Sequence, residues 1–386
     1  MLNLLAFVVF ASSLFMRAVD PVIPQIAAGL GVAPATAALL STGFTLPYAL
    51  VQPVLGALAD MFSKTRMMLS CLGALAVTLV ISGLSTNFEV LMVMRVVAGL
   101  AAGGTFPIAL AIAADRVPVK ERQVAVGRLL FAAMTGNLLG ATGSGIIGDL
   151  IGWRGVFIAG GAVGLIVLAA AIPGFRWLAE PAGRFDLSTL WPNYRAIFSN
   201  PRAKYCFGAV FLEAVFMFGI FPYMATMLHS EGETRASIAG FVIAGFGIGG
   251  IIYTMSVSWL LSHIGERRLM RMGGVVMGCC LIVIALRAPW QAEFINFMTL
   301  GIGFYFLHGV IQIHVTELAP AARASATALH SFFFFIGQGL GPVVYGAGFA
   351  TIGPAPVLVL GSIVLAATGF VCSARLRHPS LVAAGA

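Results

Sequence analysis

The sequence predicts an all-α membrane protein with twelve transmembrane helices arranged as two pseudo-symmetric six-helix bundles. Hydrophobic residues make up 60% of the chain, charged residues only 9%, and the mean hydropathy is +0.99, whereas about a quarter of a soluble domain is charged. Long apolar runs alternate with short polar loops. The two halves of the chain also resemble each other when one is shifted along the other by 202 residues.

Each apolar run is close to the roughly 20 residues that a helix needs to cross a bilayer. The runs are continuously apolar rather than alternating in ten-residue pieces, which favours helices over a β-barrel. The twelve expected spans are 3–28, 36–59, 67–85, 90–113, 125–148, 156–175, 205–228, 237–261, 269–287, 293–315, 325–349 and 356–374.

The only long polar interruption separates an N-terminal bundle, 1–175, from a C-terminal bundle, 205–386. Within this linker, 176–204, the aromatic residues Trp191, Tyr194 and Phe198 alternate with basic residues. This pattern predicts a short amphipathic helix at the inner membrane surface.

The basic residues predict the orientation. With both termini in the cytoplasm, 17 Lys and Arg fall in inside segments and 3 in outside segments, which follows the positive-inside rule. The net charge of +8 is therefore a topology signal, and nucleic-acid binding is not expected. The first span carries Arg17 and Asp20, so we expect it to remain in the mature protein rather than act as a cleaved signal.

The five cysteines form no C-x-x-C pair, so neither a disulfide framework nor a zinc site is expected. No nucleophile–base or metal constellation is visible either. We therefore expect neither an enzyme nor a bound cofactor.

The internal repeat shows in loops as well as in glycines. Each half starts and ends on the same side of the membrane, so the halves are expected to be parallel repeats. With the 202-residue shift, the matching pairs are Gly43 with Gly245, Arg66 with Arg268, Gly99 with Gly301, Asp115 with Glu317, and Pro118 with Pro320.

The loop between spans 2 and 3 reads "GALADMFSKTRMML" and resembles the signature of the major facilitator superfamily at Gly56, Asp60 and Arg66. Span 4 carries the similar Arg95 and Gly99 pair. The stretches "GNLLGATGSG" (136–145) and "GWRGVF" (152–157) resemble the bacterial proton-coupled efflux branch of that family. The resemblance covers essentially the whole chain and implies the major facilitator fold and the bacterial inner membrane.

The resemblance also implies a charge latch that closes the cytoplasmic side in one conformation. A carboxylate at the end of span 2 would pair with guanidinium groups of nearby loops. The alternative is an inside-positive anchor with an incidental acid. The latch residues expected here are Gly56, Asp60, Arg66, Asp115, Arg116 and Arg122.

Ionisable residues within spans are costly, so each is a functional hypothesis. Arg17 and Asp20 share one helix face, and the alternative for them is a neutralised pair that only holds helices together. The resemblance places spans 1, 4, 7 and 10 around a central cavity. It suggests proton coupling through Asp20, Arg17, Arg95 and Glu213, and substrate binding by Arg17, Arg95, Glu213, Phe304, Tyr305, His308 and Gln312.

Tyr305, His308 and Gln312 follow one another at i, i+3 and i+7 and should form one polar stripe. His314 and His330 lie toward the cytoplasmic ends of their spans, where loop contacts suffice to explain them.

The sequence is thus interpreted as a secondary active transporter that moves a small organic molecule by alternating access. Proton-coupled antiport for efflux is the first hypothesis. Uptake or exchange of an organic anion, with arginines binding a carboxylate, is the second. A non-transporting receptor or scaffold on the same fold is the third. The expected partners are substrate, protons and membrane lipid, and the expected state is a monomer.

Overall fold

The computed structural model describes residues 1–53, 63–118, 121–175 and 190–376, which are mostly helical and contain no β-strand. The chain divides into two compact units. Unit 1 comprises 1–186 and 222–241, and unit 2 comprises 187–221 and 242–386. Residues 222–241 thus group with the first unit, although they follow the linker in the sequence.

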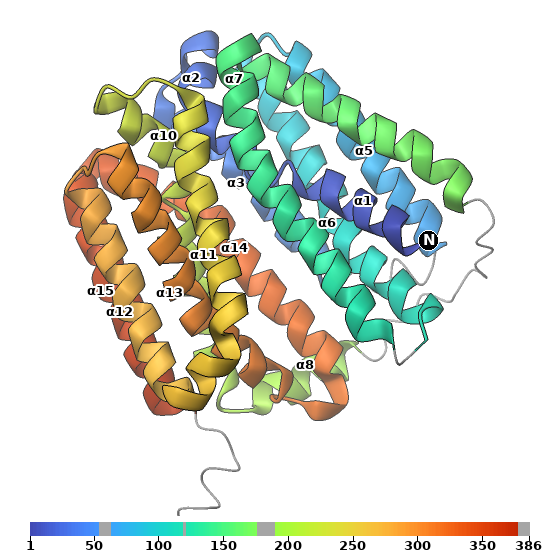
Figure 1. Ribbon diagram of the computed structural model, residues 1–386, viewed down its shortest axis with the longest axis vertical. Helices are drawn as coiled ribbons and strands as arrows, with labels where there is room; N and C mark the ends of the chain where they lie inside the picture. Colours follow the sequence, from blue (N-terminus) through green and yellow to red (C-terminus); the bar gives the residue numbers. More distant parts are fainter. Residues whose placement is uncertain (54–62, 119–120, 176–189, 377–386) are drawn as a thin grey trace, which may run out of the picture. The chain divides into compact units, whose positions relative to one another are not determined.

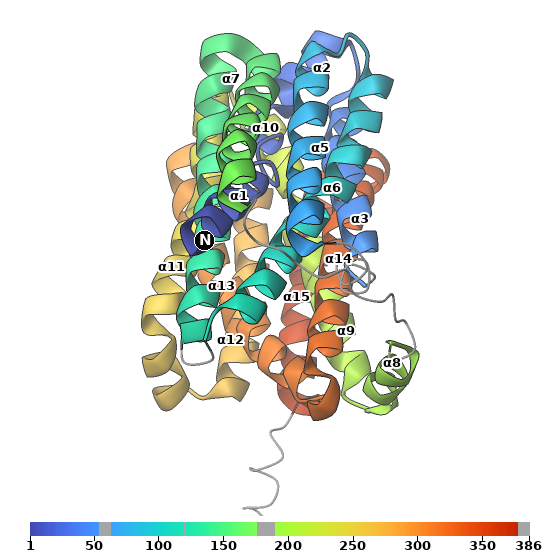
Figure 2. The same ribbon diagram turned by 90° about the vertical axis from the view of Figure 1, so that its right-hand side faces the viewer.

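Unit 1 is built mainly from six helices, with α1 against α7 and α6 packed on both α3 and α5 (Figures 1 and 2). Its elements are α1 (Leu2–Ser13), η1 (Asp20–Val22), α2 (Ile23–Leu30), α3 (Pro34–Val51), α5 (Lys64–Leu84), α6 (Phe88–Arg116) and α7 (Arg122–Phe175).

Local signals explain several helix ends. Asn87 caps α6, because its Oδ1 accepts a 2.9 Å hydrogen bond from the Val90 N–H, and Asn is among the preferred capping residues. Gly31 ends α2 in the left-handed conformation, with φ 65, which glycine adopts without a steric penalty. Gly152, with φ 77, breaks α7 where the sequence predicts two separate spans.

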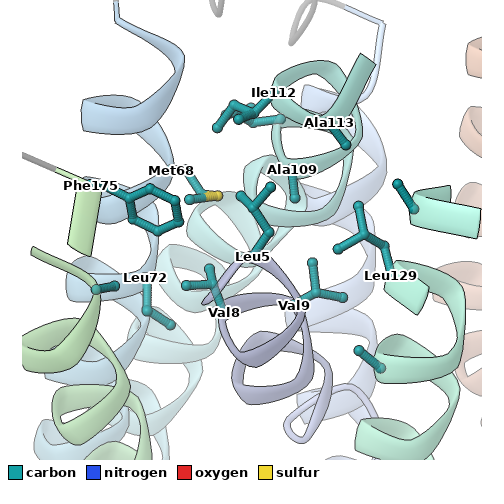
Figure 3. Close-up of a cluster of buried hydrophobic side chains, with 14 of the residues drawn as sticks. Leu5, Val8, Val9, Met68, Leu72, Ala109, Ile112, Ala113, Leu129 and Phe175 are labelled. Carbon is teal, nitrogen blue, oxygen red and sulfur yellow. The ribbon is translucent and has the colours of Figure 1, made fainter. Parts of the chain in front are cut away.

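The core of unit 1 lies where α1, α5, α6 and α7 meet. Figure 3 shows Leu5 and Val9 of α1 pointing into a cluster with Met68, Ile112 and Leu129. Every one of these side chains is almost completely buried. Within lipid this packing supplies van der Waals contact rather than escape from water.

In unit 2, α12 packs against α15 and α13, and α14 packs against α9 (Figure 1). Nearly all of α10 and the start of α11 belong to unit 1. The elements from residue 190 onward are α8 (Leu190–Ser199), α9 (Ala203–Glu213), η3 (Ala214–Phe218), α10 (Phe221–Ser230), α11 (Ala236–His263), α12 (Glu266–Ala285), α13 (Trp290–Thr316), η4 (Pro320–Ala322), α14 (Arg323–Thr351) and α15 (Pro354–Arg375). The helix α8 lies where the linker helix is expected.

Eleven of the twelve predicted spans match long apolar helices over their described residues. Among the described residues, ten helices are long and apolar enough to cross a bilayer, and one of them, Val124–Phe175, holds two predicted spans. The first predicted span is the remaining one. It is not the continuous helix expected over 3–28: α1 ends at Ser13, and turns occupy 14–19 before η1 and α2.

The seventh span is interrupted at the equivalent place. After Glu213 the helix widens into one π-helical segment, Ala214–Phe218, before α10 begins. The 202-residue shift carries the break at 14–19 onto 216–221. Interrupted helices of this kind are typical of transporter spans that form binding sites.

Helix crossings repeat with the same shift. A methyl group added at Gly99 would strike the Phe44 carbonyl, and one added at Gly301 would strike the Phe246 carbonyl. The α3–α6 crossing of unit 1 and the α11–α13 crossing of unit 2 are therefore equivalent backbone contacts. Small residues allow this close approach.

Candidate functional site

The first site surrounds Asp20, at the start of η1 just after the break in span 1. The side chain is fully buried. Its Oδ1 accepts a 2.7 Å hydrogen bond from Ser41 Oγ, and its Oδ2 lies 3.3 Å from Arg17 Nη1. An acid in the first turn of a helix is also stabilised by the helix dipole. The break thus holds a carboxylate in the interior of unit 1.

Arg95 of α6 completes this site. Its guanidinium lies 4.3 Å from the centre of the Phe44 ring, and its Nε donates a 3.2 Å hydrogen bond to the Leu40 carbonyl. Arg95 also interacts electrostatically with Asp20. Its Nη1 is buried without a hydrogen-bond partner among the described residues. Two buried arginines, Arg17 and Arg95, therefore interact with one buried acid.

The second site surrounds Glu213, the last residue of α9 and fully buried in unit 2. Its Oε2 lies 3.0 Å from His308 Nδ1, whereas its Oε1 has no hydrogen-bond partner among the described residues. The His308 ring centre is 4.9 Å from that of His330, whose Nε2 is also buried without a described partner. Three ionisable side chains from α9, α13 and α14 therefore meet.

An aromatic cluster covers this second site. Phe304 stacks on the His308 ring at 4.5 Å, and Phe334 lies 5.1 Å from the same ring. Phe218 of the π-helical segment contacts Phe246, Phe304 and Phe334 at 5.3–5.4 Å. Such ring packing excludes water and fixes the histidine orientation.

The polar stripe expected on α13 is divided. His308 is buried against Glu213, Tyr305 is half-buried and stacks on Tyr253 at 5.6 Å, and Gln312 is exposed. His330 lies deep beside His308 rather than in a loop contact, which corrects the explanation given for it from sequence. His314 lies 3.8 Å from Glu266, the first residue of α12.

Part of the expected latch lies outside the described residues, namely Gly56 and Asp60. In the described part, Lys64 Nζ lies 2.7 Å from Asp115 Oδ2. The Arg122 Nε donates to the Val117 carbonyl at 3.1 Å, and Arg66 and Arg116 are exposed. Lys64 is not among the expected latch residues. Its ion pair with Asp115 joins the start of α5 to the end of α6.

Sequence reasoning missed three polar side chains. Ser41 is an ordinary small residue in an apolar run, and only its approach to Asp20 reveals it. Glu293 is buried in α13, where Asn296 Nδ2 donates to its Oε2 at 2.9 Å; its place at a span end made it resemble a loop residue. Asp149 of α7 accepts hydrogen bonds from the Ala236 and Ser237 N–H groups, and these contacts are distant in sequence.

Nothing in the described chain gathers three or more His, Cys, Asp or Glu side chains into a group able to hold a metal ion. The chemistry available is proton binding, ion pairing and small-molecule recognition.

The comparisons with known proteins agree with this picture. The family model of the Major Facilitator Superfamily matches residues 5–342. Multidrug resistance protein 2 of Bacillus subtilis is 22% identical over 374 residues, covering 94% of this chain and 92% of that protein. The multi-drug resistance efflux pump PmrA of Streptococcus pneumoniae is 27% identical over 319 residues, covering 79% and 76%.

Solved structures share the fold. The nucleoside transporter NupG superposes with a TM-score of 0.75 at 16% identity, covering 98% of both chains. A bacterial homolog to the human lysosomal transporter Spinster gives a TM-score of 0.75 at 19% identity, covering 97% of this chain and 96% of that one. With its multi-pass helical structure and repeated halves, this chain therefore belongs to the Major Facilitator Superfamily, a family of membrane transporters and not of enzymes.

Proposed function

We propose that this transporter exports a small organic molecule in exchange for protons, with Asp20 as the proton-binding group. The observation that carries the proposal is the buried carboxylate at the broken first span, held by Ser41 and Arg17. Its relatives named as multidrug resistance and efflux proteins support the direction of transport. The excess of Lys and Arg in the inside segments supports cytoplasmic termini. The bacterial relatives support a location in a bacterial inner membrane.

The mechanism follows from charge balance. While Asp20 is ionised, it neutralises one of the two buried arginines. When a proton binds Asp20, the site loses this negative charge, and the attraction of Asp20 to Arg17 and Arg95 is lost. Such a change costs free energy in a low-dielectric interior, so protonation favours a conformation in which an arginine reaches water or substrate. Differential stability of two states is what couples proton and substrate movement.

The test is transport by purified protein in proteoliposomes with an imposed proton gradient. Asp20→Asn should abolish stimulation by the gradient, so that the ratio of flux with and without it falls to unity, while substrate counterflow survives. Glu293→Gln is the matched control, because this acid is also buried but has its own polar partner, Asn296. Full gradient dependence in Asp20→Asn would exclude Asp20 as the proton site.

Glu213 is proposed as a second proton-coupling group and, with His308, as part of the substrate-binding region. Phe304, Tyr305 and Gln312 of the same helix complete the proposed substrate residues. The unpartnered Glu213 Oε1 supports this role, because a buried acceptor without a partner costs free energy unless a proton or ligand satisfies it.

A second candidate function is uptake or exchange of an organic anion. The buried Nη1 of Arg95, which has no hydrogen-bond partner among the described residues, favours this candidate. Arg95→Ala should then abolish binding of carboxylates, and Arg95→Lys should restore it only in part because a lysine lacks the planar fork. Retained binding of neutral or cationic drugs by Arg95→Ala would favour the exporter. A receptor or scaffold would tolerate these changes altogether.

The cytoplasmic latch remains part of the proposal. The Lys64–Asp115 pair lies where the latch is expected, and we propose that Arg66, Arg116 and Arg122 act with it and with the loop acid, Asp60, to stabilise one conformation.

A further inference from the structure

A groove of about 610 Å³ runs between α1 and the first part of α7 in unit 1. This volume lies within the roughly 300–1,000 Å³ typical of small-molecule sites. One face of each helix lines it, with residues spaced by three or four positions: Asn3, Ala6, Phe7 and Phe10 from α1, and Val124, Gly127, Arg128, Phe131, Ala132 and Thr135 from α7.

Local packing explains why the groove exists. The neighbouring faces of both helices, including Leu5 and Leu129, point into the core shown in Figure 3. Further along α7, Gly136 allows the helix to touch the α1 backbone at Phe10. On the N-terminal side of this crossing in both helices, the small residues Ala6 and Gly127 leave space between α1 and α7.

The groove is apolar except at one point. Phe7 and Phe131 are 60% and 71% exposed, so their rings are open to a ligand. Among the described residues that line the groove, Arg128 is the only charged one, and none is acidic. A guanidinium at the edge of an aromatic surface suits a carboxylate or sulfonate joined to an apolar body.

We propose that this groove binds an amphiphilic organic anion, at a site separate from the residues proposed above for proton coupling and substrate binding. Binding at the groove does not depend on the proposed function. The occupant is a drug-sized amphiphile and not a bilayer phospholipid, because the volume matches a site for one small molecule. The apolar body lies on Phe7 and Phe131, and the anionic head pairs with Arg128.

The test measures binding of dansyl-labelled undecanoic acid to the full-length protein in phosphatidylcholine nanodiscs, by fluorescence. Gly127→Leu fills the groove, and no atom lies within 4 Å of a Cβ added there, so the protein should fold normally. Binding should weaken by about tenfold because the leucine occupies the volume that the alkyl chain needs. Gly208→Leu in α9 is the matched control, because its added Cβ also meets no atom within 4 Å, and it should bind as the wild type does.

Charge is tested separately. Arg128→Ala should weaken binding of the acid by about fivefold, as expected for loss of an exposed ion pair, and should leave binding of the methyl ester unchanged. Equal binding in Gly127→Leu and the wild type, or equal affinity for acid and ester in the wild type, would overturn the proposal.

Lipid is the competing occupant. Replacing part of the phosphatidylcholine by phosphatidylglycerol should leave probe binding unchanged; displacement of the probe would make the groove a lipid site and refute the proposal. The two proposals also fail separately. If transport responds to the proton gradient but the probe does not bind, only the proposal for the groove is refuted. If the probe binds but transport does not respond to the gradient, only the proposal of proton coupling is refuted.

Discussion

Asp149 holds the start of α11 against α7, and its removal should loosen that contact by a predictable amount. Its Oδ1 accepts the Ala236 N–H at 2.7 Å and its Oδ2 accepts the Ser237 N–H at 3.0 Å. These first amides of a helix have no acceptor within the helix. The backbones also touch here, because a methyl group added at Gly145 would strike the Ala236 carbonyl.

Loss of an N-terminal cap costs about 0.5–2 kcal/mol, and the favourable interaction of a carboxylate with the helix dipole places this case toward the upper half, about 1–2 kcal/mol. That range corresponds to a factor of about 5–30 in an opening equilibrium. In Asp149→Ala, the amides of Ala236 and Ser237 should therefore exchange hydrogen faster by about this factor.

Hydrogen exchange followed by mass spectrometry, on peptides that span 231–241, measures the change directly. Asp149→Asn keeps one carbonyl acceptor but loses the charge, so it should fall between the wild type and Asp149→Ala. Asp115→Ala removes an acid elsewhere in unit 1 and should leave these amides unaffected. Unchanged exchange in Asp149→Ala would show that glycine packing alone holds the two helices together, and the reasoning would be wrong.

The contact also has a functional consequence. Residues 222–241 belong to the second repeat by chain order but pack within unit 1. Alternating access, as proposed above, requires the repeats to move against each other, and we expect this contact to break during that movement. Asp149→Ala should therefore shift the equilibrium between the two conformations by the same factor of about 5–30.

Other predictions concern packing and the turn before α11. Gly99→Ala and Gly301→Ala should each lower the free energy of unfolding by about 1–3 kcal/mol, because a backbone carbonyl cannot move aside for the added methyl group. Gly208→Ala should be tolerated and is the control. Thermal unfolding compares the three variants, and a large difference between Gly99→Ala and Gly301→Ala would argue against equivalent crossings. The hydrogen bond from Arg235 lowers the pKa of the Glu233 carboxyl, so the turn should be most stable above the usual glutamate pKa of about 4.3 and loosen as pH falls through the lowered value. Amide exchange at the turn measures this loosening, and Glu233→Gln should remove its pH dependence.

Neither interruption was predicted, because 3–28 and 205–228 were each expected to be one continuous span. The first span does contain Pro21 and Pro24, which can loosen a helix, but the π-helical segment after Glu213 has no comparable signal. Its residues, Ala214–Phe218, are an ordinary apolar run. Whether such a run stays α-helical depends on neighbours such as Tyr345, whose OH donates to the Phe216 carbonyl at 2.6 Å.

The sequence by itself determined the membrane class, the span positions, the repeat and the identity of the buried charges Arg17, Asp20, Arg95 and Glu213. Hydropathy, loop charge and a fixed repeat length are properties of the chain read in order. Only the tertiary structure decided which groups meet: Ser41 with Asp20, His330 with His308, and Asp149 with the start of α11. Those contacts join residues on different helices, and their formation depends on rotation and spacing of whole helices, which the order of residues along one helix does not specify.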